Sequence, residues 1–153
     1  MPTRSPSDVA LDGGCKADRL HHKIVPPDAT QADPWKADPE DHDFGAARDY
    51  LSLVYLPKTA ERIAEELRNA TTIHTYKAKD ILRASRLQPL GRKNFHVRSD
   101  LDKITKGEKL SPVLLVRDAS RGLLIIADGF HRICASRLVN EDLVIPCRIT
   151  TAQ

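Results

Sequence analysis

The sequence predicts a small α+β domain, in which a small mixed β-sheet with flanking helices is preceded by an α-helical pair and an irregular N-terminal arm. The chain has 153 residues, which is enough for one domain with a real core and too few for two. Residues 44–70 carry apolar residues at helical spacing, and residues 113–150 hold three apolar runs of strand length bounded by turn-forming residues. We expect an arm at 1–43 and a single domain at 44–153, with its sheet-containing core at 71–153.

The arm differs from the rest of the chain in composition. Residues 1–43 hold six of the ten prolines and 5 Lys/Arg against 9 Asp/Glu, and they show no periodicity. Such a segment buries too little apolar surface to offset its ordering entropy, so we expect an irregular or disordered acidic arm with Trp35 as a docking point. The remainder carries 19 Lys/Arg against 12 Asp/Glu, which suits a phosphate-bearing ligand or weak nucleic-acid contact but also an ordinary domain with solvated lysines.

Cysteine usage and hydropathy indicate the compartment. The three cysteines have no paired spacing, so neither a disulfide framework nor a zinc site is indicated. The N-terminus lacks the apolar core of a signal peptide, and no run reaches transmembrane length. We expect a soluble cytoplasmic protein without membrane contact.

Two amphipathic helices follow the arm. Asp43 is a good N-cap, and Phe44, Ala47 and Leu51 then lie on one helical face. Pro57 ends that helix or begins the next, in which apolar residues recur at i, i+3, i+4 and i+7 from residue 60. We expect a helical hairpin packed on the main domain.

The middle of the chain alternates short elements. Residues 71–76 predict a strand, 78–85 a short helix and 88–97 a loop. Ser99 predicts the N-cap of another short helix, and Gly107 predicts its end.

The last third predicts three strands and a helix. Pro112 precedes a strand at 113–117, and a turn at 118–122 connects it to a second strand at 123–127, so the two should pair antiparallel. A helix should follow at 130–140 and a closing strand at 144–150, with alternate residues of that strand on one face.

The sequence ADGFHR at residues 127–132 is the strongest functional signal. A strand that runs into a helix leaves the first backbone N–H groups of the helix unpaired at its electropositive end, where an anion can bind. Gly129 would allow close approach, while His131 and Arg132 would add donors. The same residues also fit an ordinary turn, with Asp128 as N-cap, Gly129 as a tight-turn residue, His131 at the rim of the core and Arg132 as a surface charge.

The segments SDLDKITKGEKLSPVLLVR, LLIIADGFHRICASRL and VIPCRI together resemble the ParB-like N-terminal domain of the ParB and sulfiredoxin superfamily. The resemblance covers roughly residues 72–150 and is most specific at 127–135. It implies a ParB/sulfiredoxin-like fold that binds a nucleotide's phosphates at Gly129, Phe130, His131 and Arg132. A nucleotide triphosphate with Mg²⁺ is the implied ligand.

Phe130 departs from the family pattern. Sulfiredoxins carry a nucleophilic cysteine at this position, so sulfinic acid reduction by that route is excluded. ParB proteins carry a glutamate there that is tied to CTP hydrolysis, and His131 replaces the first arginine of their motif. Part of the superfamily is described as "ParB-like nuclease", so nuclease or nucleotide-hydrolase activity is the candidate chemistry, with His131 or Asp128 assisting a water molecule.

Other candidate residues have simpler explanations. Cys134 and Cys147 lie on predicted core faces and should be packed thiols. His42 between two aspartates looks like a metal ligand, but capping by Asp43 explains the pattern better, and we predict no metal site of protein ligands. The strongest basic run supplies accessory phosphate or nucleic-acid contacts, or forms a solvated basic face: Lys77, Lys79, Arg83, Arg86, Arg92 and Lys93.

The sequence therefore leads to two functions of different class. The first is binding of a nucleotide or other phosphorylated ligand at residues 128–132, with phosphodiester or nucleotide hydrolysis as an added activity. The alternative is a non-catalytic interaction module that docks a protein partner through the N-terminal arm and residues 44–70.

Overall fold

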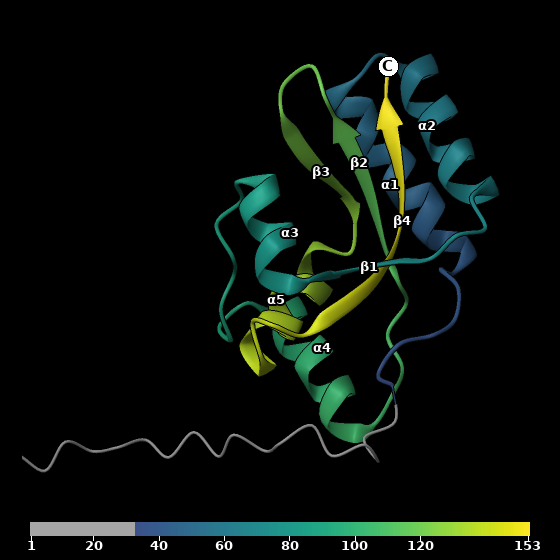
Figure 1. Cartoon of the computed structure of the whole chain (residues 1–153). Coiled ribbons are helices and arrows are strands. Elements are labelled where there is room, and N and C mark those ends of the chain that lie inside the picture. The colour runs from purple at the N-terminus through teal and green to yellow at the C-terminus, as the bar shows by residue number, and fades with distance from the viewer. Residues whose placement is uncertain (1–32) are drawn as a thin grey trace, which may run out of the picture. The chain divides into compact units, whose positions relative to one another are not determined.

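A four-stranded mixed sheet forms the centre of the computed structural model, which describes residues 33–153. The sheet has the order β1-β4-β2-β3, with β1 (His74–Lys77), β2 (Val113–Asp118), β3 (Leu123–Asp128) and β4 (Val144–Ala152). Helices α1 (Asp41–Val54) and α2 (Pro57–Asn69) cover one face, while α3 (Ala78–Ser85), α4 (Phe95–Lys106) and α5 (Phe130–Val139) pack toward the other face and one end (Figure 1). The predicted fold class is confirmed.

Strand pairing places the β3–α5 turn at one end of the sheet. β2 and β3 form the predicted antiparallel pair, and β4 runs parallel to β2 and antiparallel to β1. Alternate residues of β2 face opposite layers: Leu114 and Val116 pack against α1 and α2, whereas Val113 and Leu115 pack on the side of α3. Because β2 and β3 are antiparallel, the end of β3 at Asp128 lies beside the start of β2 at Leu114, and α5 begins two residues later.

The helical pair packs on the sheet as predicted, but its first cap differs. Phe44, Ala47 and Leu51 are buried in the expected face of α1, and Pro57 is the first residue of α2. Asp43 is not the N-cap: α1 begins three residues earlier than predicted, at Asp41, with Glu40 as N-cap, and Asp43 is the third helical residue. Its carboxylate accepts a hydrogen bond from the Glu40 backbone N–H at 2.8 Å, which is one half of a capping box.

Helix α4 begins earlier than predicted. Residues 95–97 were expected in a loop and Ser99 was expected as the N-cap, but Asn94 caps the helix. The side-chain oxygen of Asn94 accepts hydrogen bonds from the backbone N–H groups of His96 at 3.0 Å and Val97 at 3.1 Å. Val97 is buried in the core, and this burial stabilises the additional first turn of the helix. Gly107 ends the helix with φ of 75°, as its position predicts.

The described part of the predicted arm packs on the domain. Trp35 is 4% exposed within the core that contains α3, and its backbone forms a parallel bridge with Leu110. Residues 33–40 contain no helix, and the burial of Trp35 agrees with its predicted role as a docking point. The predicted boundary at residue 43 is wrong, because α1 begins at Asp41 and Asp43 is buried within it. The prediction for residues 1–32 lies outside the described residues. Within residues 33–153, no helix combines the length and apolar character needed to cross a bilayer.

Candidate functional site

The β3–α5 turn delivers an uncapped helix end. β3 ends at Asp128, Gly129 is the N-cap of α5, and the Ile133 backbone N–H donates to the Gly129 carbonyl at 3.0 Å as the first helical bond. No side chain in the described part of the chain caps this end, so the backbone N–H groups of Phe130, His131 and Arg132 keep their capacity to donate. The aligned peptide dipoles make the same end electropositive.

Gly129 is required by packing, not by ligand access. Its φ of 100° lies in a region that L side chains rarely adopt. A Cβ atom at this position would lie 2.5 Å from Val113 Cγ1 and 3.1 Å from Arg132 Nη2. The prediction that the missing side chain opens the turn to a ligand is therefore wrong: Val113 of β2 and the Arg132 guanidinium fill that space.

The guanidinium of Arg132 is held inside the protein. It donates to the Ser111 carbonyl at 2.8 Å, forms a close ion pair with Asp128, and lies 3.6 Å from Asp43 Oδ1. Its side chain is 13% exposed. The expectation of a free phosphate-binding fork on the surface is wrong, because two carboxylates on α1 and β3 already occupy it.

Ser111 completes this network. Its hydroxyl donates to the Asp43 carboxylate in a close hydrogen bond, and the Glu40 backbone N–H lies 3.2 Å from the same hydroxyl oxygen. The network therefore joins three segments distant in sequence: the start of α1, the residue before Pro112, and the β3–α5 turn.

Burial separates the acidities of the two aspartates. Burial is the main cause that raises the pKa of Asp128 to about 6; the charge of Arg132 opposes this rise, and the charge of Asp43 adds to it. Burial also acts to raise the pKa of Asp43, but the hydrogen bond from Ser111 and the charge of Arg132 outweigh it, so the pKa of Asp43 is lowered. The two carboxyl groups beside the Arg132 guanidinium therefore differ in acidity, and Asp43 keeps its charge to a lower pH than Asp128.

A polar cleft of about 440 Å³ opens beside the turn. Its walls come from the segment before α1 and the first turn of α1, one face of α4, the segment before β2, and the β3–α5 turn. The residues that line this polar cleft are Lys36, Glu40, His42, Asp43, His96, Ser99, Asp100, Lys103, Glu108, Lys109, Leu110, Ser111, Asp128, Gly129, His131 and Arg132. Five carboxylates and four Lys or Arg side chains are among them, so the polar cleft is mixed in charge and has no basic excess.

His131 packs against a second histidine in the lining of the polar cleft. The ring of His131 lies 4.8 Å from the ring of His96 of α4, centroid to centroid. Burial first, and the charge of His96 second, lower the pKa of His131. At pH 7 the His131 ring is therefore neutral and can accept a proton. Of the two predicted catalytic residues, His131 is the one that is not already held in an ion pair.

The contribution of α4 to the polar cleft was not predicted from the sequence. His96, Ser99 and Lys103 line the polar cleft from one face of this helix. Their spacing of i, i+3 and i+7 is the signal that could have revealed them, but it was hidden because the helix was expected to start at Ser99. The Lys103 ammonium nitrogen lies 3.5 Å from Oδ1 of Asp100 on the same helix.

The other predicted site residues lie away from the polar cleft. Phe130 packs partly buried against the core, so it anchors α5. The ammonium groups of Lys77 and Lys79 lie 3.5 and 2.6 Å from Asp142 Oδ1, and the hydrogen bond to Asp142 is the main cause that raises the pKa of Lys79. Arg92 and Lys93 are exposed in the loop before α4 and do not line the polar cleft. The structure does not gather these four cations at the turn.

Metal-ligand geometry in the described chain is found at the start of α1. Ligand atoms of Glu40, His42 and Asp43 lie within 4.8 Å of one another. Two cations already neutralise these acids, however: the Lys36 ammonium is 2.5 Å from Glu40, and the Arg132 guanidinium is 3.6 Å from Asp43. Both carboxylates take part in the capping box of α1, with Glu40 as the N-cap and Asp43 as the third helical residue, so Asp43 contributes to capping but not as the predicted N-cap.

The two cysteines in the described chain are core residues. Cys134 and Cys147 are both fully buried. Burial is the main cause that raises the pKa of the Cys134 thiol, and it raises the pKa of the Cys147 thiol to about 12. Both are protonated at pH 7 and are poor nucleophiles, as predicted.

A search for similar proteins found no match among protein-family models, curated proteins or solved structures.

Proposed function

We propose that this chain is a ParB-like domain that binds a phosphorylated small molecule, such as a nucleotide, in the polar cleft. The order of elements supports the family: a helix ended by Gly107, Pro112 before a strand, a second strand that runs through Asp128 and Gly129 into a helix, and a closing strand. This is the order on which the sequence resemblance depends.

One observation carries the proposal of phosphate binding. The uncapped N-terminus of α5 opens on the polar cleft opposite His96, Ser99 and Lys103 of α4. A phosphoryl group between the two helices would accept hydrogen bonds from the first amides of α5, and the hydroxyl, imidazole and ammonium groups would reach its remaining oxygens. Since the polar cleft has no excess of basic side chains, these hydrogen-bond donors, and not a net positive charge, would hold the anion.

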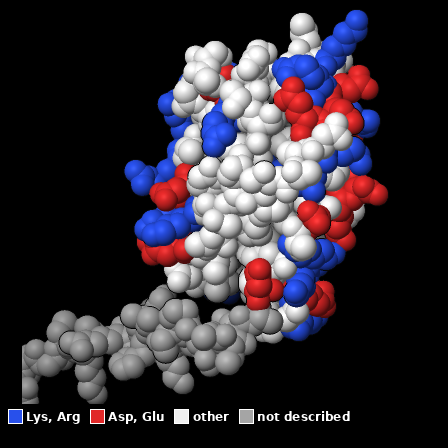
Figure 2. All heavy atoms as spheres, turned by 45° about the vertical axis from the view of Figure 1, so that its right-hand side comes forward, with Lys and Arg blue, Asp and Glu red and all other residues white. Residues whose placement is uncertain are grey.

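This charge balance favours a compact phosphorylated ligand over a nucleic-acid backbone. Proteins that track nucleic acid present a continuous basic surface. In Figure 2, Lys and Arg alternate with Asp and Glu along the margins of the visible face. DNA or RNA is therefore the comparison ligand in our tests, and a nucleotide is the ligand that we propose.

Arg132 has a positioning role in this proposal. It holds Asp128 and the Ser111 carbonyl, and so fixes the turn against the start of α1. Hydrolysis of a bound phosphate ester would use His131, whose neutral ring can take a proton from the attacking water. Mg²⁺ would arrive with a nucleotide triphosphate and neutralise its charge.

A thermal-shift panel tests binding. The full chain is heated with ATP, CTP, GTP or a short DNA duplex, with and without Mg²⁺, and we expect at least one nucleotide to raise the midpoint as its concentration passes Kd. Lys103→Gln and Ser99→Ala should weaken this shift. Lys106→Gln is the matched control, since Lys106 lies on the same helix but does not line the polar cleft. An equal loss in the control, or flat curves for all ligands, would contradict the proposal.

Exposed leucines favour the alternative function, protein interaction. Leu53 and Leu56 are 85% and 78% exposed at the junction of α1 and α2. The apolar faces of both helices are buried against the sheet, so the leucines of this junction give residues 44–70 exposed apolar surface that could contact a partner. Flat thermal-shift curves, together with partner capture that is lost in Leu53→Ser/Leu56→Ser, would replace phosphate binding with this function.

A further inference from the structure

An apolar groove lies at the other end of the sheet and shares no lining residue with the polar cleft. Helix α3 has eight residues, whereas α1 and α2 on the opposite face have 14 and 13. The final residues of β2 and β4 and the first residues of β3 extend beyond α3 (Figure 1). The apolar groove is the space between α3 and these strand ends.

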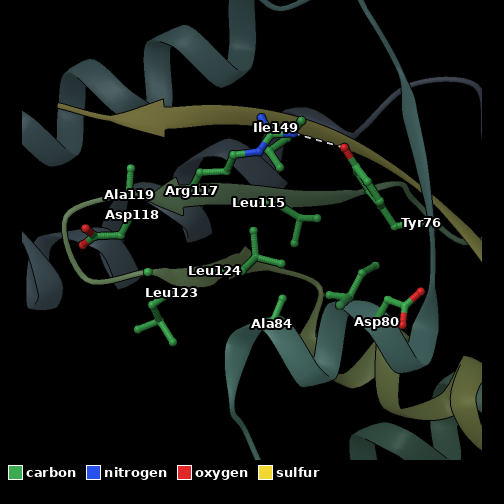
Figure 3. A pocket seen from close by; sticks show the side chains of 12 residues that line it. Tyr76, Asp80, Ala84, Leu115, Arg117, Asp118, Ala119, Leu123, Leu124 and Ile149 are labelled. Carbon is green, nitrogen blue, oxygen red and sulfur yellow. Dashed lines mark hydrogen bonds between the residues drawn. The ribbon is translucent and has the colours of Figure 1, made fainter.

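The apolar groove has the size and lining of a small-molecule site. Its volume is about 440 Å³, within the range of roughly 300–1,000 Å³ typical of ligand pockets. Leu115, Leu124 and Ile149 line it from the sheet, and Ile81 and Ala84 from α3 (Figure 3). The walls converge from a helix and all four strands, so the surface is concave, which suits a ligand better than a flat partner surface.

The guanidinium of Arg117 lies in this apolar lining and, among the described residues, has no carboxylate partner. Arg117 is exposed, and its Nη2 donates to the Tyr76 hydroxyl oxygen at 3.1 Å (Figure 3). Within residues 33–153, no carboxylate forms an ion pair with Arg117. The two acids of the apolar groove are otherwise engaged: Asp118 with Arg121 at 2.6 Å, and Asp80 with Arg83 at 3.4 Å.

Tyr76 adds a second hydrogen-bond donor beside Arg117. Because its hydroxyl oxygen accepts from Arg117, its own O–H remains available as a donor. The guanidinium and the phenol together offer N–H and O–H donors to one anionic group, beside a surface that takes an apolar chain or ring.

We propose that the apolar groove binds a small amphipathic carboxylate, an aliphatic or aryl acid whose apolar part lies on Leu115, Leu124 and Ile149. Its carboxylate accepts hydrogen bonds from Arg117 and Tyr76. Charge complementarity selects this occupant, since the uncompensated charge of the apolar groove is one cation and its remaining surface is almost wholly apolar.

Methyl NMR of the full chain tests the proposal directly. Octanoate is titrated into protein labelled at Leu and Ile methyl groups, with octan-1-ol as the uncharged probe of the same length. We expect saturable shifts at Leu115, Leu124 and Ile149, and weaker binding of octan-1-ol. Arg117→Gln should raise the Kd for octanoate about tenfold, the loss of one charge-assisted interaction, and leave the Kd for octan-1-ol unchanged.

Two further variants control the experiment. Arg98→Gln removes an exposed arginine of α4 outside the apolar groove and should leave octanoate binding unchanged. Ala84→Phe, at an exposed helical position, should fill the apolar groove and block both probes. The proposal is overturned if octanoate moves none of these methyl groups, if Arg117→Gln has no effect on it, or if the methyl groups shift with protein concentration as sedimentation reveals a dimer.

Discussion

Replacing Arg132 by glutamine should destabilise the fold far more than the same change in an exposed helical pair. Arg132 and Asp128 form a pair at i,i+4 spacing whose side chains are 13% and 19% exposed. Arg62 and Glu66 form a pair with the same spacing whose side chains are 43% and 41% exposed. The two pairs differ in burial, which makes Arg62→Gln the matched control.

The magnitude follows from what Arg132→Gln leaves behind. Asp43 and the Ser111 carbonyl lose their guanidinium, and Asp43 is 3% exposed. Removal of one member of a buried ion pair costs about 3–5 kcal/mol, because the remaining charge stays buried. Asp128 can escape by protonation, since its pKa is already raised to about 6, so we place the loss near the lower end, at about 3 kcal/mol. The exposed Arg62 pair should cost about 0.5 kcal/mol.

Urea unfolding followed by circular dichroism at pH 7 measures both losses. Asp128→Asn combined with Arg132→Gln should recover part of the stability, because one of the two unpaired carboxylates is then removed. A loss below about 1 kcal/mol for Arg132→Gln, or one equal to that of Arg62→Gln, would refute the buried network.

Three further predictions concern the same elements. The stability of the chain relative to Asp128→Asn should increase as the pH falls from 7 to 4, since the pKa of Asp128 is raised from 3.8 to about 6 in the fold. The favourable protonation of Asp128 is fully present below pH 3.8 and lost as the pH rises through about 6, with an upper limit of about 3 kcal/mol, and urea titrations that give a constant difference would contradict it. Gly129→Ala should cost more than about 2 kcal/mol in urea unfolding, against about 1 kcal/mol for Gly107→Ala, because a Cβ clashes with Val113 only at Gly129; equal losses would refute the packing argument. Asn94→Ala should lower stability by about 1 kcal/mol through loss of the α4 cap, and an unchanged unfolding midpoint would show that this cap is not used in solution.

The sequence predicted the order and type of the elements because local signals agreed with the tertiary structure. The apolar run of strand length after Pro112 and the apolar face of α2 directly reflect burial in the core. Gly107 reflects the left-handed backbone conformation that ends α4. The prediction for the start of α4 was wrong for a local reason: Asn94 and Ser99 are both good N-cap residues. Burial of Val97, a tertiary effect, decided between them.

The strand-to-helix turn of the candidate site could be predicted from the sequence, but the contacts of its side chains could not. The strand-to-helix turn at Asp128 and Gly129 is a local pattern and lies where predicted. The partners of Arg132 come from residues 43 and 111, and no local pattern reveals that these positions meet at the turn. The role of Gly129 was predicted wrongly for the same reason. The Val113 side chain, which leaves no room for a Cβ atom at Gly129, belongs to another strand.

The amides at the start of α5 provide the most direct test of phosphate binding. A ¹⁵N-labelled full chain is titrated with ATP and Mg²⁺, with adenosine as the ligand that lacks phosphate. We predict saturable shifts at the backbone amides of Phe130, His131 and Arg132 and at the polar face of α4, produced by ATP and absent with adenosine. Amides of the α5 turn that stay unmoved at saturating ATP, or that move equally with adenosine, would contradict phosphate binding at this helix end.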